Sequence, residues 1–132
     1  MEATSLRLGN AVEWLGDSPF IVSGLKDNGD ITIKTVDNDS VNLTMGQSIK
    51  PIELTEEILL KCGFKKTPAN NSYYLPITKL KAEVHFEIFR GELVCVLYCS
   101  TGSFIPNNIK YVHELQNLIH SLTGEELILN LT

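Results

Sequence analysis

The sequence predicts an α+β fold in which an N-terminal β-barrel of the SH3-like kind is followed by an αβββαβ unit. The first observation is that residues 5–53 consist of short β-rich runs separated by turn residues, the pattern of a small, bent antiparallel barrel. The second is that residues 54–132 alternate between helical and strand patterns. At 132 residues, the chain has the size of one domain. We therefore expect two parts, residues 1–53 and 54–132, that pack together as one compact domain.

The predicted strands of the first part lie between clusters of glycine, asparagine and aspartate. They are residues 11–15, 20–25, 31–36 and 41–45. Asn28 and Gly29 separate two of these runs, and both residue types tolerate the positive φ angles of a type I′ turn. The pair therefore predicts a β-hairpin.

A short helix is predicted at residues 56–62, where the β-rich pattern ends. Thr55 can cap this helix, two glutamates occupy its first turn, where the helix dipole favours acids, and Gly63 can end it. Three strand candidates follow, at residues 73–79, 82–89 and 92–99. Arg90 and Gly91 are predicted to form a two-residue turn between the last two strands.

This turn determines which side chains share a face of the predicted hairpin, because the register is counted outward from the loop. One face is predicted as core and holds Ala82, Val84, Phe86 and Ile88, with Leu93, Cys95, Leu97 and Cys99. The opposite face carries Glu83, Glu87 and Glu92 among His85, Phe89, Val94, Val96 and Tyr98. We interpret these last five residues as a candidate interaction face.

The C-terminal segment predicts an amphipathic helix over residues 109–122. Its apolar residues recur at steps of three and four, at Ile109, Val112, Leu115, Leu118, Ile119 and Leu122. This stripe must be buried, and the core face of the hairpin is its natural partner, whereas Gln116 and Asn117 are predicted to face away. Gly124 is placed to end the helix, before a closing strand at residues 125–131.

Three segments of the chain carry a resemblance to a known family. They are LRLGNAVEW at 6–14, LTEEILLKCGF at 54–64 and IKYVHELQNLIHSLTGEELI at 109–128. They resemble a family of small uncharacterised proteins of Bacteroidales genomes, often found in prophages and other mobile elements. The resemblance spans most of the chain and implies a bacterial or bacteriophage protein of the cytoplasm. It brings no activity, catalytic residue or ligand that could be transferred to positions here.

The composition is typical of a folded, soluble protein. Hydrophobic residues make up 43% of the chain and charged residues 20%, and no apolar run approaches the roughly 20 residues that span a bilayer. The N-terminus lacks the basic start and apolar stretch of a signal peptide. We therefore expect a protein that is not exported by a signal peptide and has no membrane contact, in keeping with the bacterial cytoplasm that the resemblance implies. The three cysteines, Cys62, Cys95 and Cys99, form no CxxC pair and are interpreted as free core thiols.

The sequence contains no recognised catalytic or metal-binding motif, such as a glycine-rich phosphate loop, an HExxH pair, a nucleophile elbow or an EF-hand loop. Glu83, His85 and Glu87 would project from the same face of one strand, and carboxylates with an imidazole can bind a divalent metal. The two carboxylates, however, would lie about 13 Å apart along the strand, too far to reach one ion. We therefore favour binding over catalysis and expect no metal or other cofactor. An enzyme with a site assembled from both parts is a less favoured alternative.

The most suggestive functional signal is a local inversion of charge. The net charge is −5, yet no acidic residue occurs between Ile58 and Ala82, where five lysines lie. Amines, amides and phenol rings suit an anionic, planar ligand such as a nucleotide. The candidate ligand-binding residues are Lys65, Lys66, Asn70, Asn71, Tyr73, Tyr74, Lys79 and Lys81. The alternative interpretation is a solvated loop and strand edge whose lysines prevent unwanted strand pairing.

Two functional hypotheses follow. The first is a non-catalytic binding protein, encoded by a phage or mobile element, that acts as a counter-defence factor by sequestering a small anionic, nucleotide-like signal. The second is a protein-interaction or self-assembly module, such as a host-factor inhibitor or a virion-associated accessory protein, which would use the mixed face and could form a homo-oligomer. Long nucleic acid is not an expected partner, because residues 1–54 carry four basic and eight acidic side chains.

Overall fold

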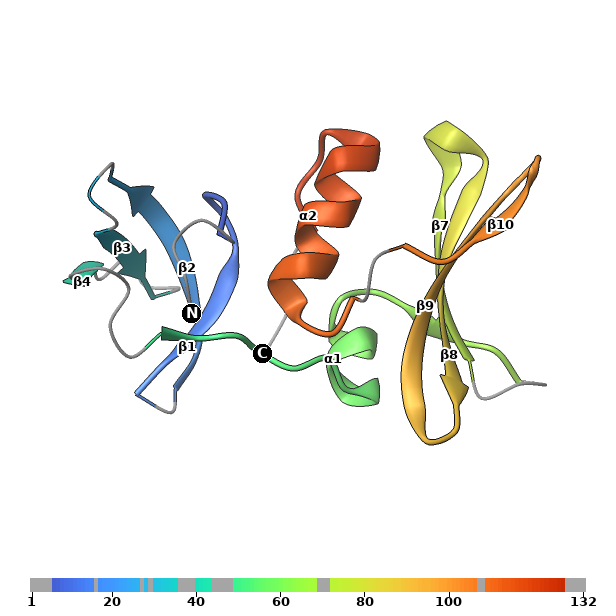
Figure 1. The fold of residues 1–132 in the computed structure, drawn as a ribbon, viewed down its shortest axis with the longest axis horizontal. Coiled ribbons are helices and arrows are strands. Elements are labelled where there is room, and N and C mark those ends of the chain that lie inside the picture. The colour runs from blue at the N-terminus through green and yellow to red at the C-terminus, as the bar shows by residue number, and fades with distance from the viewer. Residues whose placement is uncertain are drawn as a thin grey trace. The chain divides into compact units, whose positions relative to one another are not determined.

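The computed structural model describes residues 6–15, 17–26, 28, 30–35, 40–43, 49–68, 72–106 and 109–127. Within these ranges the chain forms two antiparallel sheets and two α-helices, which confirms the predicted α+β class (Figure 1). Contacts within the chain divide it into two units. The first consists of Met1–Glu53 and Tyr111–Leu118, and the second of Leu54–Lys110 and Ile119–Thr132. Helix α2, Val112–Thr123, supplies residues to both units.

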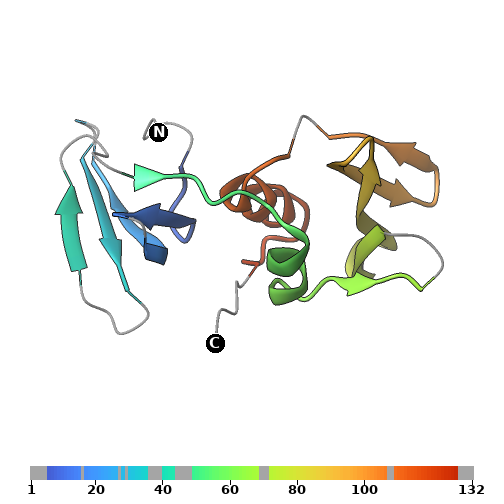
Figure 2. The same ribbon diagram turned by 90° about the horizontal axis from the view of Figure 1, so that it is seen from below.

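The described part of the first unit contains a sheet with the strand order β4-β3-β2-β1-β5, in which all neighbours are antiparallel. The strands are β1 (Ala11–Trp14), β2 (Asp17–Leu25), β3 (Ile31–Lys34), β4 (Ser40–Leu43) and β5 (Ile49–Lys50). Their buried core is formed by Leu6, Val12, Val22, Ile31, Ile33 and Ile49. Irregular pairing between Val12 and Trp14, and between Val22 and Gly24, bends the strands. Figure 2 shows the resulting curl of the sheet. The structure thus has a curled antiparallel sheet where the sequence predicts a barrel.

The hairpin predicted around Asn28 is present, since β2 and β3 pair as far as Leu25 and Ile31. The Lys26 N–H donates to the carbonyl oxygen of Asp30 at 3.0 Å, and the side-chain oxygen of Asn28 accepts the N–H of Asp30 at 3.0 Å. Residues 27 and 29 lie outside the described residues, and with them the predicted type I′ geometry of the Asn28–Gly29 pair.

Helix α2 begins at Val112, three residues later than the hydrophobic pattern predicts. The carboxylate of Glu114 accepts the N–H of Tyr111 at 3.0 Å, which is a capping contact that starts the helix at this point. Tyr111 also forms an isolated antiparallel bridge with Glu53, so the chain directly before the helix is extended. Neither contact can be predicted from the spacing of the apolar residues alone.

The two amides predicted to face away from the buried side of this helix are instead engaged with the start of β1. Gln116 is only 2% exposed, and its side-chain oxygen accepts the N–H of Ala11 at 2.8 Å. The side-chain oxygen of Asn117 accepts hydrogen bonds from Asn10 at 2.8 Å and from Arg7 Nε at 3.0 Å. The prediction is wrong because a search for apolar periodicity treats every amide as a solvent-facing residue, whereas a paired amide can be buried.

The second unit contains helix α1 (Glu56–Lys61) and an antiparallel sheet with the strand order β10-β9-β8-β7-β6 in its described part. The strands are β6 (Lys65–Lys66), β7 (Ser72–Ile77), β8 (Ala82–Phe89), β9 (Glu92–Cys99) and β10 (Gly102–Phe104), with a 3-10 turn at Thr78–Leu80. The short edge strands β6 and β10 are additions to the three predicted strands. The αβββαβ order is therefore not reproduced. Residues 125–127 form no strand, and the rest of the predicted closing strand lies outside the described residues.

The β8–β9 hairpin has the register that the sequence predicts. The paired residues are Phe89 with Glu92, Glu87 with Val94, His85 with Val96, and Glu83 with Tyr98. Arg90 and Gly91 form the loop with φ angles of 52° and 79°. Positive values at both positions are those of a type I′ turn, whose twist matches that of the flanking strands.

The inner face of the second sheet packs against α1 and the residues that follow this helix. Phe86 is fully buried, and the ring of Phe64 meets it edge to face with the centroids 5.7 Å apart. Tyr73 of β7 lies on the same face, and its hydroxyl donates to Glu56 of α1 at 2.8 Å. These contacts attach the helix to the sheet. On the face predicted as core, the buried residues are Ala82, Val84, Phe86, Cys95 and Leu97.

Replacing Gln116 by leucine is expected to destabilise the protein by about 1–3 kcal/mol. The substitution keeps the approximate size of the side chain but leaves the buried N–H of Ala11 without its acceptor. Urea unfolding followed by circular dichroism measures the loss, and Ser121→Ala, at an exposed position of the same helix, is the matched control. Equal stability of the two variants would contradict a structural role for the Gln116 amide.

Acid is expected to destabilise the protein through His113. This side chain is 5% exposed, and its Nδ1 has no hydrogen-bond partner among the described residues. Burial lowers the pKa of His113, an effect partly opposed by the negative charge of Glu114. The folded pKa lies below the unfolded value of about 6.5. The free energy of unfolding therefore loses nothing through His113 above about pH 6.5, and it falls as the pH drops through that value, because the unfolded state then binds the proton more readily. Unfolding free energies measured between pH 5 and 8 should show a shallower acid loss for His113→Phe than for wild type or His120→Gln.

Candidate functional site

The face of the second sheet opposite α1 is the candidate functional site. Figures 1 and 2 both show α1 on one side of this sheet and no helix on the other side in the described part of the chain. We call this side the outer face. It carries Tyr74 from β7, Glu83, His85, Glu87 and Phe89 from β8, and Glu92, Val94, Val96 and Tyr98 from β9. The strand register thus places all five residues of the predicted interaction face on one side of the sheet.

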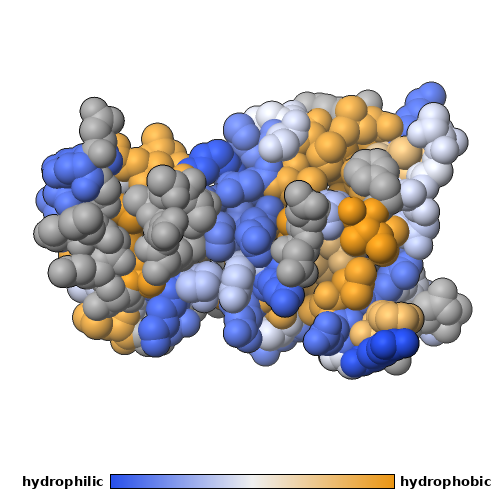
Figure 3. Space-filling model, in the orientation of Figure 1, coloured by the Kyte–Doolittle hydropathy of each residue, from blue (hydrophilic) through white to orange (hydrophobic). Residues whose placement is uncertain are grey.

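The two most exposed large apolar residues among those described in this unit lie at the end of the β8–β9 hairpin and just after β10. Phe89 is 62% exposed and Ile105 68% exposed, and the Arg90 guanidinium lies 5.3 Å from the centre of the Phe89 ring. Figure 3 shows apolar surface gathered over the strands of this unit. Ile88 is 40% exposed, although the sequence predicts it as core, because β7 pairs with β8 only as far as Glu87. The end of the β8–β9 hairpin therefore extends beyond strand β7.

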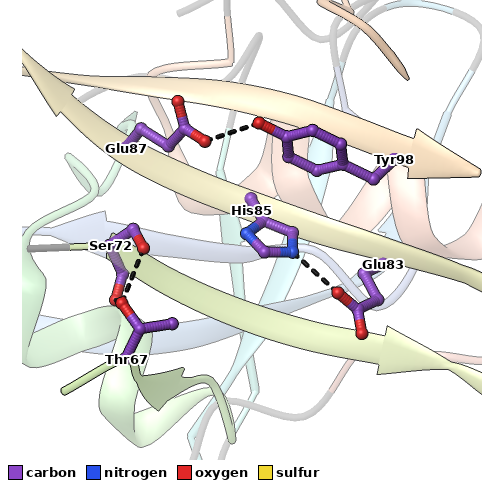
Figure 4. Close-up of polar contacts among 6 residues, drawn as sticks. All are labelled: Thr67, Ser72, Glu83, His85, Glu87 and Tyr98. Atoms are coloured by element: carbon purple, nitrogen blue, oxygen red, sulfur yellow. Dashed lines mark hydrogen bonds and ion pairs between the residues drawn. The ribbon is translucent and has the colours of Figure 1, made fainter. Parts of the chain in front are cut away.

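His85 is the centre of a group of aromatic and acidic side chains on the outer face. Its ring is stacked beside Tyr74, with the centroids 5.9 Å apart and an interplanar angle of 28°. It meets Tyr98 edge to face at 4.6 Å. Its Nε2 lies 2.9 Å from the Oε1 of Glu83, at hydrogen-bond distance (Figure 4). The imidazole is thus held from three sides by residues of three strands.

The second carboxylate of the group is held by Tyr98. The Tyr98 hydroxyl donates to Oε1 of Glu87 at 2.7 Å across the two strands (Figure 4). This hydrogen bond raises the pKa of Tyr98, and partial burial and the negative charge of Glu87 act in the same direction. Glu83, His85 and Glu87 follow one another along the same face of β8, and the two carboxylates have different partners. We define the outer cluster as Tyr74, Glu83, His85, Glu87 and Tyr98.

On the described part of the outer face, no serine or cysteine is paired with a base. Ser72 lies on the outer face of β7, but its hydroxyl lies 2.8 Å from the hydroxyl of Thr67, and Figure 4 shows the two side chains turned toward each other. Glu83 binds His85 and Glu87 binds Tyr98, so the outer cluster does not present three ligands to one ion. No group of three or more histidine, cysteine, aspartate or glutamate residues that could hold a metal occurs in the described ranges.

The structure divides the predicted ligand-binding lysines and tyrosines between two sides of the sheet. Lys65 pairs with Tyr74 on the outer face, whereas Lys66 pairs with Tyr73, which points to the inner face. Tyr73 is 3% exposed, and its hydrogen bond to Glu56, together with burial and the negative charge of that carboxylate, raises its pKa. Sequence reasoning missed this division because it treated the two neighbouring tyrosines as one aromatic pair, although side chains alternate along a strand.

The remaining members of that set lie around the sheet. Lys81 is exposed and ends the 3-10 turn in a left-handed conformation, with φ 50°. Lys79 lies within that turn, and its side chain is outside the described part of the structure. Asn70 and Asn71 are also outside the described residues. Among the described members, the structure pairs Lys65 with Tyr74 on the outer face and Lys66 with Tyr73 on the inner face, and it does not bring the whole set to one place.

Among the described residues, two hollows that border the second sheet matter here. An open groove of about 520 Å³ beside the outer face is lined by Pro76, Ile77, Thr78, Lys81, Ala82, Glu83, Tyr98, Cys99 and Ser100. A second hollow of about 380 Å³ is lined mainly by apolar residues, among them Cys62, Leu75, Ile77, Ile119 and Leu127. The first groove joins the outer cluster through Glu83 and Tyr98, and it therefore enlarges the surface that the cluster presents.

The three cysteines are free thiols in different environments. Cys62 and Cys95 are buried, which raises their pKa values to about 11 and about 12. Cys99 is half-buried, and its sulfur lies 3.3 Å from the hydroxyl of Thr101, the main cause of its lowered pKa. The core prediction thus holds for the first two thiols, while the third lies on the wall of the open groove.

Comparison of the chain with protein-family models, with curated proteins and with solved structures found no match. Within the described residues, neither helix combines the length and the apolar content needed to cross a membrane. The function of the candidate site is therefore inferred from its geometry alone.

Neutralising Glu87 is expected to lower the pKa of Tyr98 toward the ordinary tyrosine value of about 10. In the native protein, the negative charge of Glu87 and its hydrogen bond together favour the neutral phenol of Tyr98. Glu87→Gln removes the charge and weakens the hydrogen bond. Tyrosine ring signals recorded by NMR during a titration above pH 9 measure the change. Glu56→Gln is the matched control, because it should lower the pKa of Tyr73 and leave that of Tyr98 unchanged.

Proposed function

We propose that this chain is a non-catalytic binding protein that docks a protein partner on its outer face. The observation that carries the proposal is a sheet face without a covering helix in the described structure, on which Phe89 and Tyr98 are 62% and 37% exposed. Exposed aromatic residues surrounded by polar groups are typical of binding surfaces. The absence of a nucleophile and base pair in the described cluster adds no support for catalysis.

The first sheet would serve as a scaffold in this proposal, and its curled form is compatible with an SH3-like barrel. The resemblance to small proteins of Bacteroidales mobile elements makes a host protein of a phage-infected bacterium the proposed partner. A counter-defence role would then consist of covering a surface of that host protein. Self-assembly through the same face is the alternative within this class, and light scattering over a dilution series separates the two, because a self-assembling chain changes mass with concentration.

Truncation of Phe89 is expected to weaken partner binding about tenfold or more. An exposed aromatic residue at the end of a hairpin is the kind of side chain that dominates interfaces, and its removal leaves the folded core intact. A photo-cross-linking amino acid at position 89 first identifies the partner in the host cell, and the affinity of the purified partner is then measured for Phe89→Ala. Leu8→Ala, at a position 53% exposed in the first unit, is the matched control. Equal affinities of the two variants would contradict docking on the outer face.

A small anionic ligand is the second candidate, and one observation favours it. Lys65 lies directly opposite Tyr74, whose ring is stacked beside that of His85, so one ammonium group and an aromatic platform share the outer face. A nucleotide could place its base on the rings and its phosphate near Lys65. The carboxylates of Glu83 and Glu87 on the same face oppose an anion, which is why we place this candidate second.

Lys65→Glu is expected to abolish nucleotide binding if the second candidate is correct, whereas Lys66→Glu should have little effect. The two lysines are neighbours on β6 but pair with tyrosines on opposite faces of the sheet. The two variants therefore change the net charge equally and differ only in the face of the sheet that carries the change. Isothermal titration with a nucleoside monophosphate and with a cyclic dinucleotide provides the measurement. Equal responses of the two variants would exclude a pocket on this face.

A further inference from the structure

The outer cluster combines negative charge with aromatic ring faces in the middle of the sheet. Glu83 and Glu87 both come from β8, the central strand of the order β10-β9-β8-β7-β6. The basic residues near this face lie around it: Lys65 on the edge strand β6, Arg90 in the hairpin loop over the Phe89 ring, and Lys81 in the groove beside it. The centre of the face is therefore negative, and its positive charge is at the margin. This distribution is complementary to a basic group rather than to an anion.

The two carboxylates are oriented but retain capacity to bind. Glu83 uses Oε1 in its contact with His85, and Glu87 uses Oε1 to accept the Tyr98 hydroxyl. Within the described structure these contacts leave Oε2 of each group for a further donor. The side chain of Glu83 is 49% exposed, so a partner can reach it. A carboxylate already held in one orientation loses little freedom when it binds a cation.

The aromatic rings supply the second element of a cation site. Tyr98 is bound to Glu87 through its hydroxyl and contacts His85 through its ring, and Tyr74 flanks His85 on the other side. A guanidinium placed over the Tyr98 ring would lie close to the Glu87 carboxylate. It would therefore gain both a cation–π interaction and an ion pair, and a planar guanidinium suits both contacts better than an ammonium group.

The spacing of the carboxylates indicates the form of the partner. Glu83 and Glu87 lie four residues apart on one strand, about 13 Å, with His85 between them. An extended peptide has the same repeat, so residues i and i+4 of such a peptide would reach the two carboxylates while residue i+2 contacts the rings. From this geometry we infer that the outer face binds an extended segment of a partner protein with arginines at positions i and i+4. The inference rests on the proposed function and specifies the chemistry of the partner.

Two synthetic peptides of equal composition test this inference on the full chain. Acetyl-Arg-Ser-Val-Ser-Arg-amide has arginines at i and i+4, and acetyl-Arg-Ser-Val-Arg-Ser-amide has them at i and i+3, on opposite sides of an extended chain. NMR titration at pH 7 should show the first peptide binding at least about threefold more tightly, with shifts centred on Tyr74, His85 and Tyr98. Glu83→Gln and Glu87→Gln should each weaken its binding about two- to fivefold. Glu57→Gln, which makes the same charge change on α1, should leave it unchanged.

Equal affinities for the two peptides, or equal losses in Glu57→Gln and Glu87→Gln, would overturn the inference, because attraction to the net negative charge would then explain the binding. Shifts outside the outer face, or tighter binding of a peptide with glutamates in place of the arginines, would overturn it as well. If these variants behave like wild type while Phe89→Ala still weakens the identified partner, docking on the outer face stands and the basic segment is rejected. If peptide binding is lost in the two glutamine variants but Phe89→Ala has no effect on the partner, the cation site stands and the proposed function fails.

Discussion

The register of the β8–β9 hairpin is the constraint on which the two faces of the second sheet depend. Because side chains alternate along a strand, a shift by one residue would exchange the faces. Phe86 would then lose its contact with Phe64, and His85 would enter the space beneath α1. The loop uses a non-glycine residue, Arg90, at a φ of 52°, which costs about 1–2 kcal/mol. Burial of Phe86 and its neighbours is large enough to offset this strain.

The two faces of the same sheet are ordered by different forces. Aromatic and apolar packing, with one tyrosine hydroxyl bound to α1, holds the inner face. On the outer face, hydrogen bonds between side chains hold the rings and carboxylates in place without burying them fully. A surface built in this way is oriented before any partner arrives, so binding would require little rearrangement. The proposed binding surface would thus be defined without a deep pocket.

The parts of the structure that could be predicted from sequence are those with strong local signals. The turn at Arg90 and Gly91 was sufficient to predict the pairing of β8 with β9, because a two-residue loop leaves one register. The candidate interaction face followed from that register by counting. Edge strands as short as β6 carry too few residues for a recognisable pattern, and their pairing depends on β7. The opposite orientations of Tyr73 and Tyr74 were available from alternation alone, but the chemical similarity of the two side chains concealed them.

Helix α2 supplies residues to both units, so a single cut in the chain cannot separate one unit from the other. Its residues up to Leu118 belong to the first unit, where Gln116 and Asn117 bind the backbone and side chains at the start of β1. A fragment that stops at Glu53 would lack these amides and would expose the buried Asn10 to solvent. Synthesis of this protein on the ribosome therefore leaves the first unit without its Tyr111–Leu118 segment until nearly the whole chain has been made, although all described strands of its sheet come from residues 11–50.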